Sequence, residues 1–243
     1  MKHAPSKRQL ERLIALVRDT VFPEFAESEV NLRPEIADTL SELLSEIMPE
    51  KNEEIVSSFL SQLDELIRRL NTDVVAVMEN DPAVDSRDEV ILCYPLTEVM
   101  LHYRTAHALY HLGVPLIPRM LTEIAHSKTG VDIHPAAHIG DYFCFDHGTG
   151  IVIGATSIIG SHVVLYQGVT LGAKNFKYDE AGHPIDLPRH PILEDNVTVY
   201  SNTSILGRVR IGHDTIVGGN VWLSHDVPPY SRILQADTKG AQK

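Results

Sequence analysis

Residues 193–223 read LEDNVTVYSNTSILGRVRIGHDTIVGGNVWL, and a branched apolar residue returns at every sixth position of this stretch. These positions are Leu193, Val199, Ile205, Ile211, Val217 and Leu223. An α-helix repeats about every 3.6 residues and a β-strand about every 2, so neither produces a period of six. A six-residue repeat is typical of a parallel β-helix, in which each unit is one short strand and one turn.

The same period runs through an earlier stretch, residues 133–169. Its members are Ile133, Ile139, Phe145, Ile151, Val163 and Val169, with Ser157 as a polar exception. Ten whole repeats separate Ile133 from Leu193. A second track of mostly small or β-branched residues lies four positions after the first, at Ala137, Thr149, Ala155, Ser161, Val197, Thr203, Val209, Thr215 and Val221. Two tracks with one period indicate a structural repeat rather than chance.

Three such units make one triangular coil. Each residue of the first track is therefore expected to point inward and to stack on the residue about eighteen positions further along. Residues 173–191 interrupt the repeat with Lys, Asn, Asp, Gly, His and Pro. They predict a loop extruded from one corner of the prism.

The N-terminal half follows a helical pattern instead. Apolar residues return at helical spacing up to about residue 128, and residues 94–112 and 115–126 also suit helices. Residues 71–89, which include Asp81-Pro82, are expected to form turns. The predicted domains are an α-helical domain at 1–128, a β-helix catalytic domain at 129–235 with its loop at 173–191, and a flexible tail at 236–243.

The composition excludes several classes of function. The 243 residues carry a formal charge of -12 with basic residues spread along the chain, which argues against a nucleic-acid surface. No segment approaches the roughly 20 apolar residues of a membrane span, and the N-terminus leads into a charged helix, so a cytoplasmic location is expected. Cys93 and Cys144 are too few for a disulfide framework or a thiolate zinc site, and both are interpreted as small buried residues.

Three motifs carry residue types suited to chemistry. They are Val131-Asp132-Ile133-His134-Pro135-Ala136-Ala137, Asp146-His147-Gly148-Thr149-Gly150-Ile151-Val152-Ile153-Gly154 and Gly168-Val169-Thr170-Leu171-Gly172, and Arg189-His190-Pro191 follows the loop. In order and spacing they resemble the serine acetyltransferases, a family of hexapeptide-repeat acyltransferases, over roughly residues 81–230. The resemblance implies an α+β fold, with an N-terminal α-helical domain followed by a left-handed parallel β-helix. It also implies serine O-acetyltransferase activity with acetyl-CoA as co-substrate.

Acetyl transfer to serine needs a base, because a serine hydroxyl is a poor nucleophile at neutral pH. Histidine is the side chain with a suitable intrinsic pKa, and His147 is the candidate base. Asp132 lies fifteen residues earlier, close to one coil, so it is the candidate partner that orients the imidazole and stabilises its charged form. Without the motif, an Asp–His pair would more readily be a turn pair at a coil corner. The dyad agrees with the family, and direct attack on acetyl-CoA requires no acyl-enzyme.

The family resemblance also assigns the residues that bind serine. Asp81 and Asp146 are expected to hold the ammonium group, and Arg189 with His190 the carboxylate. Sequence alone would favour an ordinary Asp-Pro turn at Asp81, so this assignment depends on the match to the family's Asp-Pro-Ala segment.

Acetyl-CoA is expected in a groove between neighbouring prisms, where small residues let its pantetheine approach the backbone. The cofactor-binding candidates are Gly172, Ala173, Ser201 and Gly219. Lys174, Lys177, Arg208 and Arg210 are candidate phosphate contacts, with solvated surface as an equal alternative. The family's ending Gly-x-Pro-Ala-Arg is replaced here by residues 227–235.

Two other functions fit the repeat. An acyltransferase with a sugar, antibiotic or homoserine acceptor would share the prism. A scaffold, or a metal-dependent hydratase like the γ-type carbonic anhydrases, would use it differently. The hydratase would bind zinc through histidines, and the available ones are His134, His138, His162, His183, His213 and His225. The leading hypothesis needs no metal.

The expected partners are L-serine, acetyl-CoA and L-cysteine, the last as a feedback inhibitor that differs from serine by one atom. The family implies a homotrimer with active sites between subunits, which the helical domains can pair into a dimer of trimers. No nucleic acid or membrane partner is expected. The tail ends Gly240-Ala241-Gln242-Lys243 without a terminal isoleucine, so a cysteine synthase complex with O-acetylserine sulfhydrylase by that route is not expected.

Overall fold

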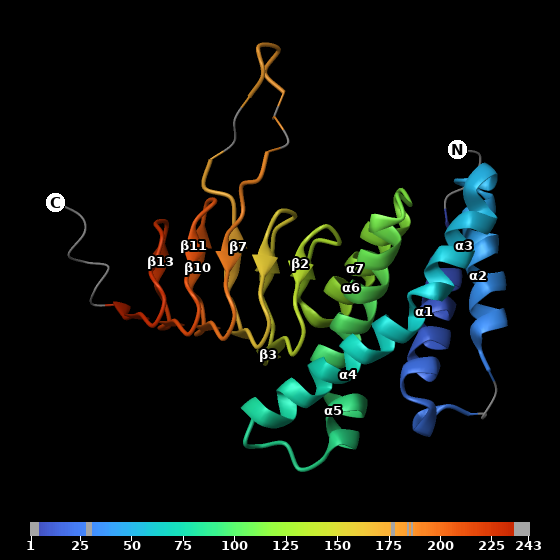
Figure 1. Cartoon of the computed structure of the whole chain (residues 1–243), viewed down its shortest axis with the longest axis horizontal. Coiled ribbons are helices and arrows are strands. Elements are labelled where there is room, and N and C mark those ends of the chain that lie inside the picture. Colours follow the sequence, from blue (N-terminus) through green and yellow to red (C-terminus); the bar gives the residue numbers. More distant parts are fainter. Residues whose placement is uncertain (1–4, 28–30, 176–177, 184, 186, 236–243) are drawn as a thin grey trace.

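The computed structural model describes residues 5–27, 31–175, 178–183, 185 and 187–235. Helices occupy one end of the molecule and a stack of short strands the other (Figure 1). The α-helices are α1 (Lys7–Val21), α2 (Arg33–Ser45), α3 (Asn52–Ser61), α4 (Leu63–Asn80), α5 (Arg87–Cys93), α6 (Pro95–His111) and α7 (Ile117–Thr129), and the 3-10 turns are η1 (Pro23–Phe25) and η2 (Pro49–Lys51).

The strands pair in parallel and form three sheets, with the orders β1-β4-β7-β10-β13, β2-β5-β8-β11 and β3-β6-β9-β12-β14. They are β1 (Asp132–Ile133), β2 (His138–Ile139), β3 (Cys144–Asp146), β4 (Val152–Ile153), β5 (Ile158–Ile159), β6 (Val164–Tyr166), β7 (Thr170–Gly172), β8 (Ile192–Leu193), β9 (Thr198–Val199), β10 (Ser204–Leu206), β11 (Arg210–Ile211), β12 (Ile216–Val217), β13 (Trp222–Leu223) and β14 (Arg232–Ile233). In the stacked coils, successive strands fall on successive faces of a triangular prism. The predicted left-handed β-helix is confirmed, and the segment between β7 and β8 projects from it as predicted (Figure 1).

The stacking interval is eighteen residues in only part of the prism. Partners in β8 and β11 are eighteen residues apart, but Asp132 pairs with Val152 twenty residues away and Thr170 with Ser204 thirty-four away. Two residues are therefore inserted after β3 and sixteen after β7. The two insertions together add eighteen residues, which equal three six-residue repeats. For this reason the six-residue count made on the sequence agrees with the structure again after the loop.

The predicted stacking partners are therefore wrong from the second coil to the start of the third. The inward strand residues there are Ile153, Ile159, Leu165 and Leu171, each paired with an inward residue of a neighbouring coil. Ile151, Ser157, Val163 and Val169 are also buried, but they lie two positions earlier. A shift of two residues keeps the same side of a strand inward, so the pattern remained apolar.

The same shift corrects the second track. Ser157 corresponds to the buried Thr203 and Thr215 of that track, so it is no exception to the repeat. The predicted track residues Thr149, Ala155 and Ser161 are exposed or half-buried instead.

In the helical half, α6 and α7 confirm the two predicted helices, and Gly130 ends α7 in the left-handed conformation with φ +74°. The turns expected at 71–89 are wrong at residues 71–80, where α4 continues to Asn80, and at 87–89, where α5 begins. Burial of Val74 and Val77, each 1% exposed, outweighs the weak helix propensity of the local sequence. The domain division at residue 128 stays a prediction, and the predicted tail at 236–243 lies outside the described residues.

Buried polar contacts join the helices to the prism. Asp73 of α4 and Arg104 of α6 form an ion pair at 2.5 Å, with side chains only 1% and 4% exposed. Arg104 also donates to the Gly140 carbonyl at 2.8 Å, and Asp73 accepts from the Phe143 amide at 3.2 Å. The orientation of the prism against α4 and α6 therefore depends on a charge pair without access to water.

His107 of α6 makes a further contact at this junction, since its Nδ1 lies 2.8 Å from the Pro135 carbonyl oxygen and donates to it. Burial lowers the pKa of His107 to about 4. The unfolded chain takes up a proton near pH 6.5 and the folded chain does not, so protonation favours unfolding. We expect the free energy of unfolding to fall between pH 6.5 and 4, by about 2 kcal/mol from this group after allowance for its partial solvent access.

The measurement is chemical denaturation of wild type and His107→Gln at pH 7.5, 6, 5 and 4.5. Carboxylates titrate in the same window, so the difference between the two proteins is the readout. His107→Gln should flatten the pH dependence, whereas the exposed His225→Gln should leave it as in wild type. Equal slopes in all three proteins would contradict the assignment.

Candidate active site

His147 lies at the corner between β3 and β4, where the first coil carries its two extra residues. Most residues of the prism with a positive φ lie at its corners, where they stack from coil to coil in two columns, here called corner ladders. One corner ladder consists of Tyr142, His162, Asn196, Asp214 and Tyr230. The other consists of Gly130, Gly150, Gly168, Asn202 and Asn220. His147 and Gly148, with φ +59° and +83°, belong to neither ladder. The two inserted residues thus place His147 outside the regular corner. The side chain of His147 is 72% exposed.

The candidate partner Asp132 lies on β1 and is fixed through its backbone, since its amide donates to the Ile151 carbonyl at 2.9 Å. Its carboxylate accepts from Arg119 Nη1 at 3.0 Å. Within the described ranges, no hydrogen bond or ion pair joins Asp132 to His147. The His147 Nε2 instead lies 3.8 Å from Asp146 Oδ1.

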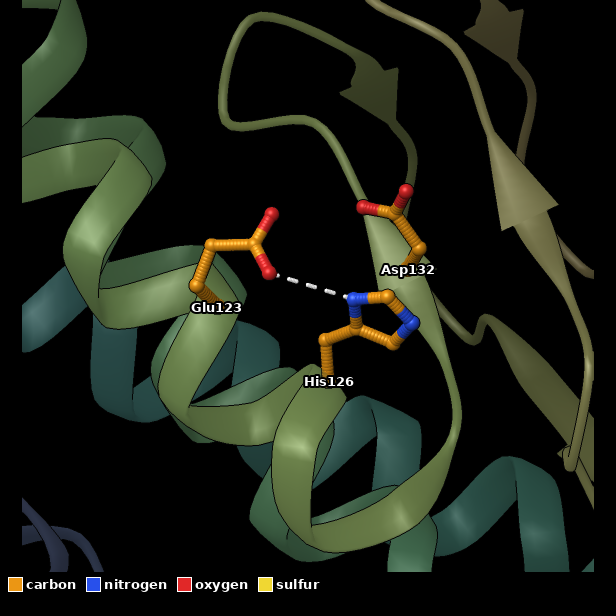
Figure 2. Close-up of side chains that lie close together, drawn as sticks. All are labelled: Glu123, His126 and Asp132. Carbon is orange, nitrogen blue, oxygen red and sulfur yellow. Dashed lines mark hydrogen bonds and ion pairs between the residues drawn. The ribbon is translucent and has the colours of Figure 1, made fainter.

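Asp132 also lies close to Glu123 and His126 of α7 (Figure 2). One ligand atom from each of these residues lies within 4.8 Å of the others, which makes this the candidate metal cluster among the residues that the structure describes. Arg119 already forms ion pairs with both carboxylates. The cluster therefore holds its own cation, and the hypothesis of a zinc site built from prism histidines gains no support from it.

Asp81 and Asp146 come together in one small pocket, although 65 residues separate them. Asp81 follows α4 and Asp146 ends β3; the other lining residues are Val77, Asn80, Tyr94, Cys144, Phe145, Val164 and Tyr166. Asp81 does form the Asp-Pro turn, because its Oδ1 accepts from the Ala83 amide at 2.8 Å. Its Oδ2 accepts from Tyr94 Oη at 2.9 Å, and this hydrogen bond raises the pKa of Tyr94 to about 12.

Cys144 is not suited to acid–base chemistry. Burial raises the pKa of Cys144 to about 12, so its thiol stays protonated and unreactive at neutral pH. Cys93 is exposed at the end of α5, so the prediction that both cysteines are buried is wrong for this one.

Arg189 and His190 lie in a different part of the molecule. Arg189 borders a groove below the projecting loop, together with Lys174 and Arg208. The His190 ring is packed on Gly154, where an added Cβ would lie 2.0 Å from ring atom Cδ2. Its Nδ1 accepts from the Thr156 amide at 3.1 Å, so the neutral ring carries its proton on Nε2. Burial, followed by the charges of Arg189 and nearby His134 and Arg208, lowers the pKa of His190 to about 4.

The candidate acetyl-CoA residues flank the sheet that contains β7, β10 and β13. Gly172 ends β7, and a Cβ there would lie 2.9 Å from Leu206 Cδ2. At the opposite corner, a Cβ on Gly219 would lie 3.2 Å from the Ser201 carbonyl oxygen. At both corners a side chain in place of the glycine would therefore press on a neighbouring coil.

The side chains of the candidate phosphate contacts differ in the hydrogen bonds and ion pairs that they already make within the chain. Lys174 Nζ donates to Ser224 Oγ at 3.0 Å, and Arg208 donates to the Thr156 and His190 carbonyls at 2.6 and 3.0 Å. Arg210 is paired with Glu194 at 2.7 Å. Lys177 lies outside the described residues.

Three contacts around these residues had not been expected from the sequence. They are Arg119 on Asp132, Tyr94 on Asp81 and Thr156 on His190. Each joins residues on different elements or coils, so no local spacing could reveal it. His134 makes a local hydrogen bond, since its Nδ1 accepts from the Ala136 amide at 3.1 Å.

No described helix is long and apolar enough to cross a membrane. No protein-family model matches the chain. It is 45% identical over 194 residues to a plasmid-encoded serine acetyltransferase of Synechococcus elongatus, a match that covers 79% of this chain and 61% of the relative. The chain therefore spans less than two thirds of that relative's length.

Other relatives match over more of their length. The serine acetyltransferase of Bacillus subtilis is 36% identical over 167 residues, which cover 69% of this chain and 73% of that one. The crystal structure of Entamoeba histolytica serine acetyltransferase 1 in complex with L-cysteine superposes with a TM-score of 0.83 at 33% identity, over 91% of this chain and 85% of that one. The crystal structure of the Neisseria gonorrhoeae enzyme in complex with serine gives a TM-score of 0.64 at 27% identity, over 91% and 94%. With the prism and the helical half both shared, the chain belongs to the serine acetyltransferase family.

Proposed function

We propose that the chain is a serine O-acetyltransferase, which transfers acetyl from acetyl-CoA to the hydroxyl of L-serine and releases O-acetyl-L-serine and CoA. This is the first step of cysteine biosynthesis from serine. The observation that carries the proposal is the pocket with Asp81 and Asp146, two carboxylates suited to an ammonium group, directly beside the exposed His147.

His147 would act as general base. As it takes the proton from the serine hydroxyl, the oxygen attacks the thioester carbonyl carbon and forms a tetrahedral intermediate. The carbon–sulfur bond then breaks, and the imidazolium returns its proton to the departing CoA thiolate. Asp132 would stabilise the imidazolium, which requires the exposed His147 side chain to turn from Asp146 towards Asp132.

The serine carboxylate would be bound by Arg189 and His190. Arg189 supplies charge, and His190 a neutral Nε2–H donor, in keeping with its low pKa. Arg189, which His190 follows in the chain, and the Asp81–Asp146 pair line different pockets of one chain. A site that contains both sets therefore favours a homotrimer, in which one subunit supplies the aspartates and His147 and its neighbour supplies Arg189 and His190. Pairing of two trimers through the helical halves is the corresponding larger assembly.

Acetyl-CoA would lie along the corners that carry Gly172 with Ala173 and Ser201 with Gly219, where backbone groups can bond its amides. Lys174 and Arg208 are better placed for the phosphates than Arg210, whose guanidinium is paired with Glu194.

The test is thiol release from acetyl-CoA, followed with a chromogenic disulfide, for L-serine, L-homoserine and glucosamine as acceptors. We expect turnover with serine and at least tenfold less with the other two. Turnover with glucosamine or homoserine alone would move the protein to another acceptor class. No turnover with any acceptor would contradict an acyltransferase.

L-cysteine is proposed as an inhibitor that competes with serine, since it presents the same ammonium and carboxylate to the same residues. A solved relative from Entamoeba histolytica is named as a complex with L-cysteine. Steady-state kinetics at varied serine should show a raised KM for serine and an unchanged kcat. An unchanged KM with a lowered kcat would argue against the shared site.

A further inference from the structure

The carboxylate of Asp132 is part of a continuous series of charged contacts that begins on α7. His126 Nδ1 donates to Glu123 Oε2 at 3.2 Å, and Glu123 Oε1 forms an ion pair with Arg119 Nη2. Arg119 Nη1 then donates to Asp132 Oδ1 at 3.0 Å. Figure 2 shows Glu123 and His126 on the helix facing Asp132 on the first strand.

The covalent path explains why this helix faces this strand. Gly130 ends α7 in the left-handed conformation, and the chain enters β1 two residues later. Arg119 stands almost three helical turns before that end, and its long side chain contacts both Glu123, one turn further along α7, and Asp132 on the strand. The contact depends on the reversal at Gly130 rather than on sequence proximity.

Arg119 restricts the rotation of the Asp132 carboxylate. Its backbone is fixed by the bond to Ile151 and by the register with Val152, so the remaining freedom is rotation of the carboxylate. Of the described residues, Arg119 is the one that bonds this carboxylate, and it does so through Oδ1. Oδ2 is thereby left to accept a hydrogen bond from another group.

We infer that Arg119 is a positioning residue for the Asp132–His147 pair, an inference that rests on the proposed function. It holds Oδ1 so that Oδ2 can accept from the imidazole of His147 when the base is in use. Its charge also offsets part of the charge on Asp132, and Glu123 in turn offsets part of the charge on Arg119. The charged or titratable groups near the pair are Arg119, Glu123 and His126 from α7 and Asp146 from β3.

Two substitutions should therefore move the pH profile of kcat/KM in opposite directions. In Arg119→Gln the uncompensated Asp132 stabilises the imidazolium more, so the acidic limb moves to higher pH. In Glu123→Gln the full charge of Arg119 acts on Asp132, so the acidic limb moves to lower pH. The opposite shifts test whether both charges act on the pair, and the Asp132→Asn background tests whether Arg119 acts through Asp132.

The experiment uses the full chain in the thiol-release assay, with wild type, Arg119→Gln, Arg119→Lys and Glu123→Gln. We expect kcat to fall about tenfold in Arg119→Gln, with KM for serine and acetyl-CoA within about twofold, and partial recovery in Arg119→Lys. In an Asp132→Asn background the Arg119→Gln change should add little further loss, because its partner is already altered. Arg33→Gln is the matched control, since Arg33 is similarly exposed at 36% against 41% for Arg119 and pairs with Asp64 on the helical half.

An active wild type with an unaffected Arg119→Gln would overturn this inference alone, as would additive losses with Asp132→Asn or pH shifts of the same sign in the two single variants. A wild type without activity towards serine would overturn the proposed function and the inference together. Thermal melting of each variant identifies one that has failed to fold, and in that case Arg119→Lys provides the kinetic comparison.

Discussion

His147→Asn is expected to lower kcat for acetyl transfer to serine about 10³-fold, with KM for serine within about threefold of wild type. A positioned general base contributes about 10²- to 10⁴-fold, and asparagine cannot accept and return a proton. Asparagine also tolerates the left-handed backbone that His147 adopts at φ +59°, so the corner should keep its shape. Initial rates at saturating acetyl-CoA and varied serine measure both constants.

His162→Asn is the matched control for this experiment. His162 is also exposed and left-handed, with φ +56°, but it belongs to a regular corner ladder and stacks on Tyr142 at 4.4 Å. Its replacement should leave kcat within about twofold. Equal losses in both variants would indicate that the corner, and not the base, had been damaged.

Asp73→Ala is expected to lower the free energy of unfolding by about 3–5 kcal/mol, because it leaves the Arg104 guanidinium buried without its counter-charge. The substitution should weaken the junction between the helices and the prism, since Arg104 also donates a hydrogen bond to the Gly140 carbonyl. Chemical denaturation followed by circular dichroism, at one fixed protein concentration, measures the change.

Asp64→Ala provides the comparison at an exposed ion pair. Asp64 pairs with Arg33 but its side chain is 82% exposed, so the loss should not exceed about 0.5 kcal/mol. The double variant Asp73→Leu with Arg104→Met should be more stable than Asp73→Ala, because it removes both buried charges. A small effect of Asp73→Ala, equal to that of Asp64→Ala, would show that the buried pair does not hold the junction.

The architecture could be predicted because the pattern that defines each repeat lies within a few neighbouring residues. An apolar residue every six positions forces short strands to turn at regular corners, and helical spacing in the first half is equally local. The register could not be predicted, because the insertions after β3 and β7 together equal three repeats and leave the count unchanged. The helical course of residues 71–80 was also missed, since burial against other elements decided it.

The candidate site shows the same limit. The meeting of Asp81 with Asp146 agrees with their expected common role, and the roles of His147 and Asp132 stay predictions. Arg119, Tyr94 and Thr156 were not expected, because each reaches its partner across a helix–strand junction or between coils.

By itself, the sequence determined the repeat, the succession of helices and prism, and the motifs that match the family. These depend on the spacing of neighbouring residues, which the chain carries in its order. Only the tertiary structure decided which residues stack on one another in the second coil, where the two extra residues place His147, and that Arg119 contacts Asp132. The physical reason is that these outcomes follow from how coils stack and how α7 turns back onto β1, where contacts between distant residues override local preference.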